Sequence, residues 1–333
     1  MPTLAWDREE ITLADGQRVE AISPVIVSAS RATDVPAFFA KWFRDRLEAG
    51  YVRWVNPFNA HQVQYVSFSR TRVIVFWSKN PRPLIQYLHE IDAKGINYYF
   101  QFTLNDYANE GLEPNVPPLA ERVDTFRDLS QRIGKQRVVW RFDPLILTDT
   151  LTIDRLIDRV STVAEQVRDF TERLVISFAD IKVYRKVQNN LAREGVNYRE
   201  FTPDLMVEVA QRLQFLNREW NLRISTCAEG IDLELHGIEH NRCIDDALMI
   251  DAFSDDRSLM SFLGHEPDLF SDSSRPNLKD KGQRKECGCI VSKDIGMYDT
   301  CQHLCTYCYA NASCKVVQSN RLKHREGSDA MIS

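Results

Sequence analysis

The feature that most constrains the fold of this chain is an alternation of short, β-rich apolar runs with longer stretches of helical periodicity. Repeated strand–helix units of this kind are typical of α/β proteins built on a parallel sheet. We predict six strands, at Val25–Ser28, Val73–Trp77, Tyr98–Leu104, Arg137–Phe142, Leu174–Phe178 and Leu222–Thr226. The helices predicted between and after them are Ala37–Ala49, Pro81–Lys94, Pro118–Ile133, Ile153–Val167, an irregular one around Asp180–Glu194, and Pro203–Trp220.

Six strand–helix units with short connections predict a (β/α)6 partial barrel of the TIM type. The alternative is a complete eight-stranded barrel, with two weaker strands inside Tyr51–Phe68. Reacting groups of parallel barrels gather where the strands end, because the loops there vary without disturbing the packed interior. The polar residues at or just beyond the predicted strand ends are Ser28, Ser30, Arg31, Ser78, Lys79, Asn80, Thr103, Asn105, Arg141, Asp143 and Asp180. Each alone could cap a helix or a turn, but as a set they predict the site.

Near the end of the chain, Cys301, Cys305 and Cys308 are spaced C-x3-C-x2-C within CQHLCTYCYAN, and Tyr307 precedes the last cysteine. Three thiolates can hold three corners of a cubane iron–sulfur cluster, which usually has four cysteine ligands. One iron would then be open to another ligand. The alternatives are a zinc site completed by His303, or no metal.

Four other cysteines form a second pattern: Cys227, Cys243, Cys287 and Cys289. They make a full ligand set for tetrahedral zinc or for a second, saturated iron–sulfur cluster. Alternatively, Cys227 and Cys243 are small buried hydrophobes. Cys314 is expected to be structural. The predicted organisation is an amino-terminal extension over 1–24, a βα-barrel domain over 25–255 and a cysteine-rich, cluster-binding extension over 256–333.

The bulk properties predict a cytoplasmic protein. The chain starts without the basic and apolar pattern of a signal peptide, and no segment has the roughly 20 apolar residues of a membrane span. Eight cysteines in such a chain fit thiols kept reduced for metal binding better than disulfides. A net charge of −5 gives no support for nucleic acid as a partner, and the basic run Lys279–Lys285 is expected to be solvated.

Several segments together resemble a bacterial domain-of-unknown-function family with a radical-SAM-like cysteine motif at its carboxyl end. They are SASRATDVPAF, NPFN, FWSKNP, RFDPL, TCAEGID, CGC, DIGMYDTC and CTYCYAN, and the similarity runs from about Val25 to about Asn311. The CTYCYAN loop is also similar to that of spore photoproduct lyase and its radical S-adenosylmethionine relatives. Those enzymes generally place the loop after the first barrel strand, whereas here it follows all the predicted strands. A permuted arrangement would bring it to the same place.

The resemblance implies a [4Fe-4S] cluster on Cys301, Cys305 and Cys308, with S-adenosylmethionine at the open iron and Tyr307 beside the cofactor. A flavodoxin-type or ferredoxin-type donor would reduce the cluster, and cleavage of S-adenosylmethionine would give a 5′-deoxyadenosyl radical that abstracts hydrogen from a substrate that the sequence does not identify.

Several further residues are candidates for the same site. Arg31, Lys79 and Arg141 could pair with the carboxylate of S-adenosylmethionine or of an anionic substrate, and Asp143 is a further catalytic candidate. His303 could support the ligands from behind, but a lone histidine in such a loop is expected to be exposed. Tyr298 and Tyr307 could pack on the cluster or relay a radical, and packing is the expected role. Two rival functions are a zinc-dependent barrel hydrolase using Asp143, Asp180 or Glu229, and a non-catalytic iron–sulfur protein that carries electrons or binds nucleic acid.

Overall fold

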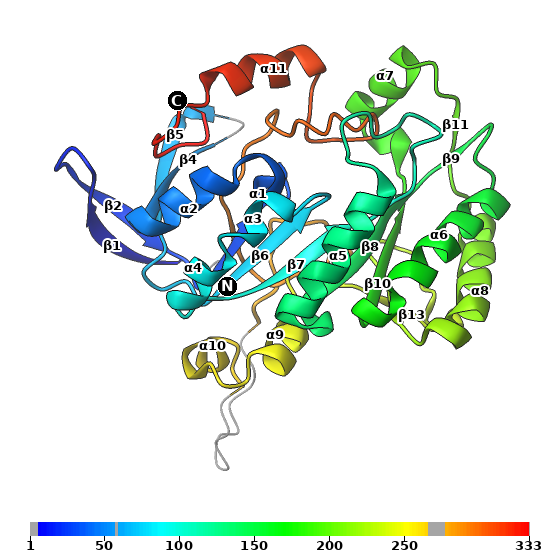
Figure 1. Ribbon diagram of the computed structural model, residues 1–333, viewed down its shortest axis with the longest axis horizontal. Helices are drawn as coiled ribbons and strands as arrows, with labels where there is room; N and C mark the ends of the chain where they lie inside the picture. The colour runs from blue at the N-terminus through cyan, green and yellow to red at the C-terminus, as the bar shows by residue number, and fades with distance from the viewer. Residues whose placement is uncertain (1–5, 57–58, 266–276, 333) are drawn as a thin grey trace.

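A computed structural model describes residues 6–56, 59–265 and 277–332 (Figure 1). Its largest element is an eight-stranded sheet in the order β13-β12-β10-β8-β7-β6-β3-β14, in which all neighbours run parallel. The strands are β3 (Ile26–Ala29), β6 (Val73–Ser78), β7 (Asn97–Thr103), β8 (Val138–Leu145), β10 (Arg173–Phe178), β12 (Arg223–Thr226), β13 (Ile238–His240) and β14 (Lys293–Asp294). We call the side on which these strands end the carboxyl edge of the sheet.

All six predicted strands are present, and they occupy six adjacent places, from β3 to β12, in chain order. The largest difference is in β8, which continues to Leu145 where the sequence predicts an end at Phe142. The prediction of an α/β fold with a large parallel sheet is therefore confirmed.

The predicted helices are also found, two of them in pieces, with a short 3-10 turn (Ile181–Val183) opening the irregular one. They are α1 (Val35–Phe38), α2 (Ala40–Ala49), α3 (Arg82–Ile85), α4 (Leu88–Ala93), α5 (Leu119–Ile133), α6 (Ile153–Val167), α7 (Arg185–Arg193) and α8 (Pro203–Trp220). The first predicted helix is divided because Phe39, between α1 and α2, has a φ of −131°, which is outside the helical range. In α8 the Thr202 side chain accepts a hydrogen bond from the Leu205 N–H and Pro203 begins the helix, as N-terminal capping favours.

The large sheet is open in the described residues: β13 and β14 form its two edges and do not pair with each other. A closed barrel is therefore not what the chain forms. The alternative of two barrel strands in Tyr51–Phe68 is wrong, because β4 (Tyr51–Asn56) and β5 (Asn59–Ser67) belong to a separate sheet. That sheet has the order β1-β2-β5-β4 and includes β1 (Asp7–Thr12) and β2 (Arg18–Ser23), on the left of Figure 1. Pro57 and Phe58 of the NPFN segment lie outside the described residues.

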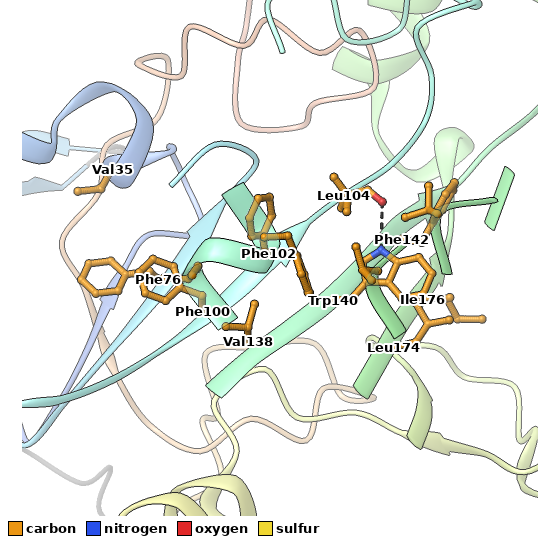
Figure 2. Packing of buried hydrophobic residues seen from close by; sticks show 14 of the residues in the cluster. Val35, Phe76, Phe100, Phe102, Leu104, Val138, Trp140, Phe142, Leu174 and Ile176 are labelled. Carbon is orange, nitrogen blue, oxygen red and sulfur yellow. Dashed lines mark hydrogen bonds between the residues drawn. The ribbon is translucent and has the colours of Figure 1, made fainter. Parts of the chain in front are cut away.

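Both faces of the large sheet are buried, which explains why its strands read as continuous apolar runs. One face packs under the helices through alternate residues such as Phe76, Phe100, Trp140 and Ile176, as Figure 2 shows. Trp140 is fully buried, and its indole N–H donates to the Leu104 carbonyl at 3.1 Å.

The opposite face carries Val73, Val75, Tyr99, Val139 and Val175. It is covered by residues from the 243–290 segment, which includes α9 (Asp246–Ala252) and α10 (Arg257–Phe262). Those two helices, the short pair of β9 (Leu147–Thr148) with β11 (Tyr198–Arg199), and α11 (Cys314–Lys323) were not predicted. None of the described helices is long and apolar enough to cross a membrane.

The strand that matters most for the site, β14, was also missed, because two residues carry no readable period. Lys293 pairs with Val27 and Asp294 with Ser28, so β14 lies parallel to β3 at the edge of the sheet. Gly296, just after it, passes so close to Ser30 that a Cβ there would meet the serine Oγ at 1.8 Å. The chain therefore runs directly from a sheet strand towards the cysteine loop, which we define as residues 301–308.

Lys293 connects β14 to the small sheet, with its Nζ 3.4 Å from the centroid of the Trp54 ring on β4. Burial lowers the pKa of this ammonium from 10.5 to about 8. Between these two pH values the unfolded chain binds more protons at this residue than the folded chain, so its contribution to the free energy of unfolding rises with pH. Below about pH 8 Lys293 is protonated in the folded protein, and burial of its charge lowers the free energy of unfolding by the full amount.

We therefore expect Lys293→Met to raise the free energy of unfolding at pH 7 by about 1 kcal/mol, a value reduced for partial exposure and for loss of the contact with Trp54. The gain should shrink as the pH approaches 10. Urea unfolding of both proteins at pH 7 and pH 9.5 measures it, with exposed Lys94→Met as the control that should show no such trend. A gain of equal size at both pH values would contradict this explanation.

Candidate functional site

The cysteine loop is attached to the carboxyl edge of the sheet by a buried hydrogen bond between His303 and Asp34. The His303 Nε2 lies 2.8 Å from Asp34 Oδ2, and the two side chains are 2% and 5% exposed. Asp34 also accepts from the Ala37 N–H, the Ser78 hydroxyl and the Lys79 N–H, so it joins the ends of β3 and β6 to the loop. The expectation that His303 is exposed is wrong. Its other ring nitrogen lies 3.3 Å from the Asn115 carbonyl, so neither nitrogen is left to complete a zinc site.

The connection between β7 and α5 holds the cysteine loop from a second side. The Thr306 N–H donates to the Leu112 carbonyl at 3.0 Å, the Asn115 amide donates to the Gln302 carbonyl at 2.9 Å, and the Asn115 N–H donates to the His303 carbonyl. Backbone hydrogen bonds of this kind fix a loop that has little regular structure of its own. The loop is therefore fixed against the ends of β3, β6 and β7.

The first cysteine set, Cys301, Cys305 and Cys308, places three thiols close enough to perturb one another electrostatically. Cys305 is 7% exposed, and burial raises its thiol pKa well above the usual range. Burial, with Cys308 and Asp34 nearby, raises the pKa of Cys301 to about 12. Among the described residues, no hydrogen bond joins these thiols to one another, and no three His, Cys, Asp or Glu side chains already form an ion-binding arrangement.

A buried polar network lies beside Cys305. The Lys79 ammonium is 2.7 Å from Glu113 Oε1 and donates to the Tyr307 hydroxyl at 2.9 Å. That hydroxyl donates to Glu113, and Asn105 donates to it at 3.1 Å. Two predicted residues, Lys79 and Tyr307, are thus brought together, and the network couples the ends of β6 and β7 to the loop.

The charges of this network compensate one another. Burial alone would lower the pKa of the Lys79 ammonium, but Glu113 and the neighbouring Cys305 thiol outweigh it and the pKa is raised. Burial alone would raise the pKa of the Glu113 carboxyl, but Lys79 and Arg122 outweigh it and that pKa is lowered. The ion pair is therefore present at neutral pH, and its ammonium acts on the nearest cysteine.

The second cysteine set, Cys227, Cys243, Cys287 and Cys289, also assembles although its first and last members are 62 positions apart in the sequence. The Cys227 and Cys243 sulfurs are 3.4 Å apart, and the Cys289 sulfur accepts from the Cys243 N–H at 3.2 Å. Cys287 is hydrogen-bonded to Cys289, an interaction that lowers its thiol pKa. Nevertheless, among the residues described, no three His, Cys, Asp or Glu side chains already form an ion-binding arrangement.

Arg141 and Asp143 belong to this second neighbourhood. Arg141 is buried, and it donates to the Cys243 sulfur at 3.0 Å, to Gln101 at 3.0 Å and, from Nε, to Asp143 at 3.0 Å. The other oxygen of Asp143 accepts from Ser177. Arg141 is thus occupied by protein partners and is not free to bind a substrate carboxylate in this state.

Arg31 lies between the two cysteine sets. Its guanidinium is 5.2 Å from the centre of the Trp77 ring, and its electrostatic neighbours include Cys289 and Cys243. Its Nη2 is buried without a hydrogen-bond partner in the described residues. On the other side, Tyr309 donates to the Arg31 carbonyl, and Tyr298 is an electrostatic neighbour of both Arg31 and Cys308.

Asp180, just beyond β10, accepts from Arg284 at 3.2 Å, and Ser28 on β3 shares a hydrogen bond of 2.7 Å with Ser292. Cys314 is exposed at the start of α11. Asp34 and Glu113 were missed, although both are central. Asp34 could have been found, since an aspartate two residues before Pro36 indicates a helix N-cap. No sequence signal distinguishes Glu113 from other loop carboxylates.

If Asp34 fastens the cysteine loop, Asp34→Ala should lower the free energy of unfolding by about 3 kcal/mol, because several buried donors lose their acceptor. Relative to wild type, Asp34→Ala should also accelerate hydrogen exchange in residues 301–308 by more than in β10. The surface variant Asp45→Ala, which breaks an exposed pair with Lys41, should cost less than about 1 kcal/mol. Unchanged exchange in the loop of Asp34→Ala would show that other contacts hold it.

Comparisons with known proteins give one clear assignment. A search of curated proteins finds no match. Among solved structures, a "putative alpha-L-fucosidase" from Bacteroides thetaiotaomicron VPI-5482 is similar at 8% identity and a TM-score of 0.25, over 59% of this chain and 74% of that one. A similarity that low carries no argument about fold or function. The family model described as "Domain of unknown function (DUF1848)" matches residues 26–310, and the chain belongs to this family.

Proposed function

We propose that this protein is a radical S-adenosylmethionine-type enzyme that holds a [4Fe-4S] cluster on Cys301, Cys305 and Cys308 and acts on a substrate still to be identified. The observation that carries the proposal is the position of the cysteine loop. It follows β14, a strand of the parallel sheet, and its three thiols gather at the carboxyl edge beside the ends of β3, β6 and β7.

This position supports the permuted arrangement that the sequence resemblance requires. In the superfamily the loop generally follows the first barrel strand. Here β14 lies beside β3 at one edge of the sheet, although β14 is the last of these strands in the chain. From β3 onward the strands follow the order of the chain as far as β13. We propose on this ground that the open sheet is a permuted partial barrel with β14 as its first strand.

The donor set fits the cluster. Three thiols from one short loop would hold three corners of the cluster and leave the fourth without a cysteine, as an open iron requires. When bound, the cluster and S-adenosylmethionine would supply the 5′-deoxyadenosyl radical that takes hydrogen from the substrate. A flavodoxin-type or ferredoxin-type protein would deliver the electron, which is consistent with the proposed cytoplasmic location.

The chain's own residues would then control the environment of the three thiols. Asp34 and His303 fix the loop, and Lys79 places a buried positive charge beside Cys305. Tyr307 is held by Lys79, Glu113 and Asn105, so its ring is oriented before any ligand arrives. These groups would orient ligands and tune the charge at the site, as partners beyond the metal ligands do elsewhere.

The first test is metal analysis of anaerobically purified wild type, Cys305→Ser and Cys314→Ser. We expect about four iron and four sulfide per chain at this site in the wild type and in Cys314→Ser, and almost none in Cys305→Ser. The reduced wild type should give a paramagnetic resonance signal that changes when S-adenosylmethionine is added. A cluster indifferent to S-adenosylmethionine would favour the non-catalytic iron–sulfur protein. Zinc without iron, with part of the zinc lost in Cys305→Ser, would place zinc at the first cysteine set and refute the radical mechanism.

The second test concerns Lys79. Replacing the pair in Lys79→Met/Glu113→Gln avoids leaving a lone buried carboxylate. Because the double variant removes both charges, the single variant Glu113→Gln is the matched comparison. The difference between the two variants gives the effect of the Lys79 charge alone. Relative to Glu113→Gln, the double variant should have a cluster potential lower by roughly 40 to 90 mV, since a nearby positive charge stabilises the reduced state by about 1 to 2 kcal/mol. Equal potentials would mean that Lys79 does not act on the cluster.

A further inference from the structure

The second cysteine set is formed by three separate parts of the chain. Cys227 follows β12, Cys243 precedes α9, and Cys287 and Cys289 lie in a turn whose flanks pair at Lys279 and Ile290. A Cβ at Gly288 would meet the Arg242 side chain at 3.0 Å and the Asn241 carbonyl at 3.5 Å. The Cys-Gly-Cys turn therefore packs directly against residues 241–242, next to Cys243.

The distance between these sulfurs distinguishes a site for a single ion from a site for a cluster. Two ligands of a tetrahedral zinc ion with Zn–S bonds of about 2.3 Å are about 3.8 Å apart. The Cys227 and Cys243 sulfurs are 3.4 Å apart, and hydrogen bonds link Cys243 to Cys289 and Cys289 to Cys287. The Cys227 and Cys243 sulfurs would have to separate by only about 0.4 Å to share one zinc ion, whereas two cysteine ligands of a cubane cluster lie much further apart.

The surroundings of the second set are those of bound thiolates. The Cys243 sulfur accepts from Arg141 at 3.0 Å and from the Asn241 amide at 3.3 Å, and the Cys289 sulfur accepts from the N–H groups of Cys243 and Ile244. Donors of this kind stabilise the charge of ligating sulfurs. The buried Nη2 of Arg31, which has no partner in the described structure, belongs to a guanidinium whose first electrostatic neighbour is Cys289. Four thiolates and a divalent ion carry a net charge of −2, which the buried Arg141 and the partly exposed Arg31 would help to offset.

We propose that Cys227, Cys243, Cys287 and Cys289 bind one zinc ion, separate from the iron–sulfur cluster. The ion is structural, because four protein ligands leave no open position. It ties the turn that contains Cys287 and Cys289 to the end of β12, and so anchors the segment that covers one face of the sheet and leads into β14 and the cysteine loop.

Metal content of the full-length, anaerobically purified protein tests this proposal independently of the radical mechanism. We expect about one zinc per chain in the wild type and in Cys314→Ser, and at least a tenfold loss of zinc in Cys287→Ser, with the iron of the first set retained. Cys287 is partly exposed, whereas Cys243 and Cys289 are buried, so its substitution should disturb the packing less than theirs.

A second measurement gives its main result on the wild type, so that result does not depend on whether a variant folds. Wild type grown with cobalt in place of zinc should show the visible absorption of a tetrahedral cobalt–thiolate site, and Cys287→Ser should lose it. About eight iron per chain without zinc would overturn the proposal in favour of a second cluster, and absence of the cobalt spectrum from wild type would overturn it altogether. Zinc bound without iron would support this site while refuting the radical mechanism.

Discussion

The buried hydrogen bond between Asp34 and His303 is the interaction on which the candidate site depends. One carboxylate binds the start of α1, the end of β6 and the cysteine loop, which come from residues 34–37, 78–79 and 303. A carboxylate that is 5% exposed remains stable in such a place only when its acceptor capacity is filled, and here four donors fill it. Because the bond joins the two ends of the sequence, the three thiols can reach the sheet only when both ends have folded.

The order of the strands in the sheet explains why the cysteine loop lies close to Asp34. A two-residue strand, β14, adds to the edge beside β3, so the last part of the chain takes the place next to the first strand of the large sheet. The loop that follows β14 then lies where a loop after a first strand would lie. The second cysteine set lies at the same edge, with Arg31 as an electrostatic neighbour of Cys243 and Cys289. The 3.4 Å between the Cys227 and Cys243 sulfurs is the physical reason to propose a single ion for that set.

The sequence predicts the regular part of this structure well and the site only in part. The six buried strands were recognisable because both faces of the sheet are apolar. Lys79 directly follows β6 and Arg31 lies two residues beyond β3, whereas Arg141 and Asp143 lie within β8, which is longer than predicted. Whether the sheet closes depends on how its edges meet, and no local pattern reports that. The burial of His303 follows from Asp34, 269 residues away, and β14 is defined by its neighbour β3 and not by its own residues. Long-range contacts of this kind could not be derived from spacing alone.

The most direct test of the central claim is whether the reduced protein cleaves S-adenosylmethionine at the first cysteine set. Anaerobic protein would be incubated with dithionite and S-adenosylmethionine, and 5′-deoxyadenosine would be quantified by chromatography, with Cys305→Ser and Cys314→Ser in parallel. We predict that wild type and Cys314→Ser form the nucleoside in amounts at least comparable with the enzyme, and that Cys305→Ser forms none. Equal yields from Cys305→Ser and wild type, or no nucleoside from a wild type that carries its full cluster, would contradict the proposed function.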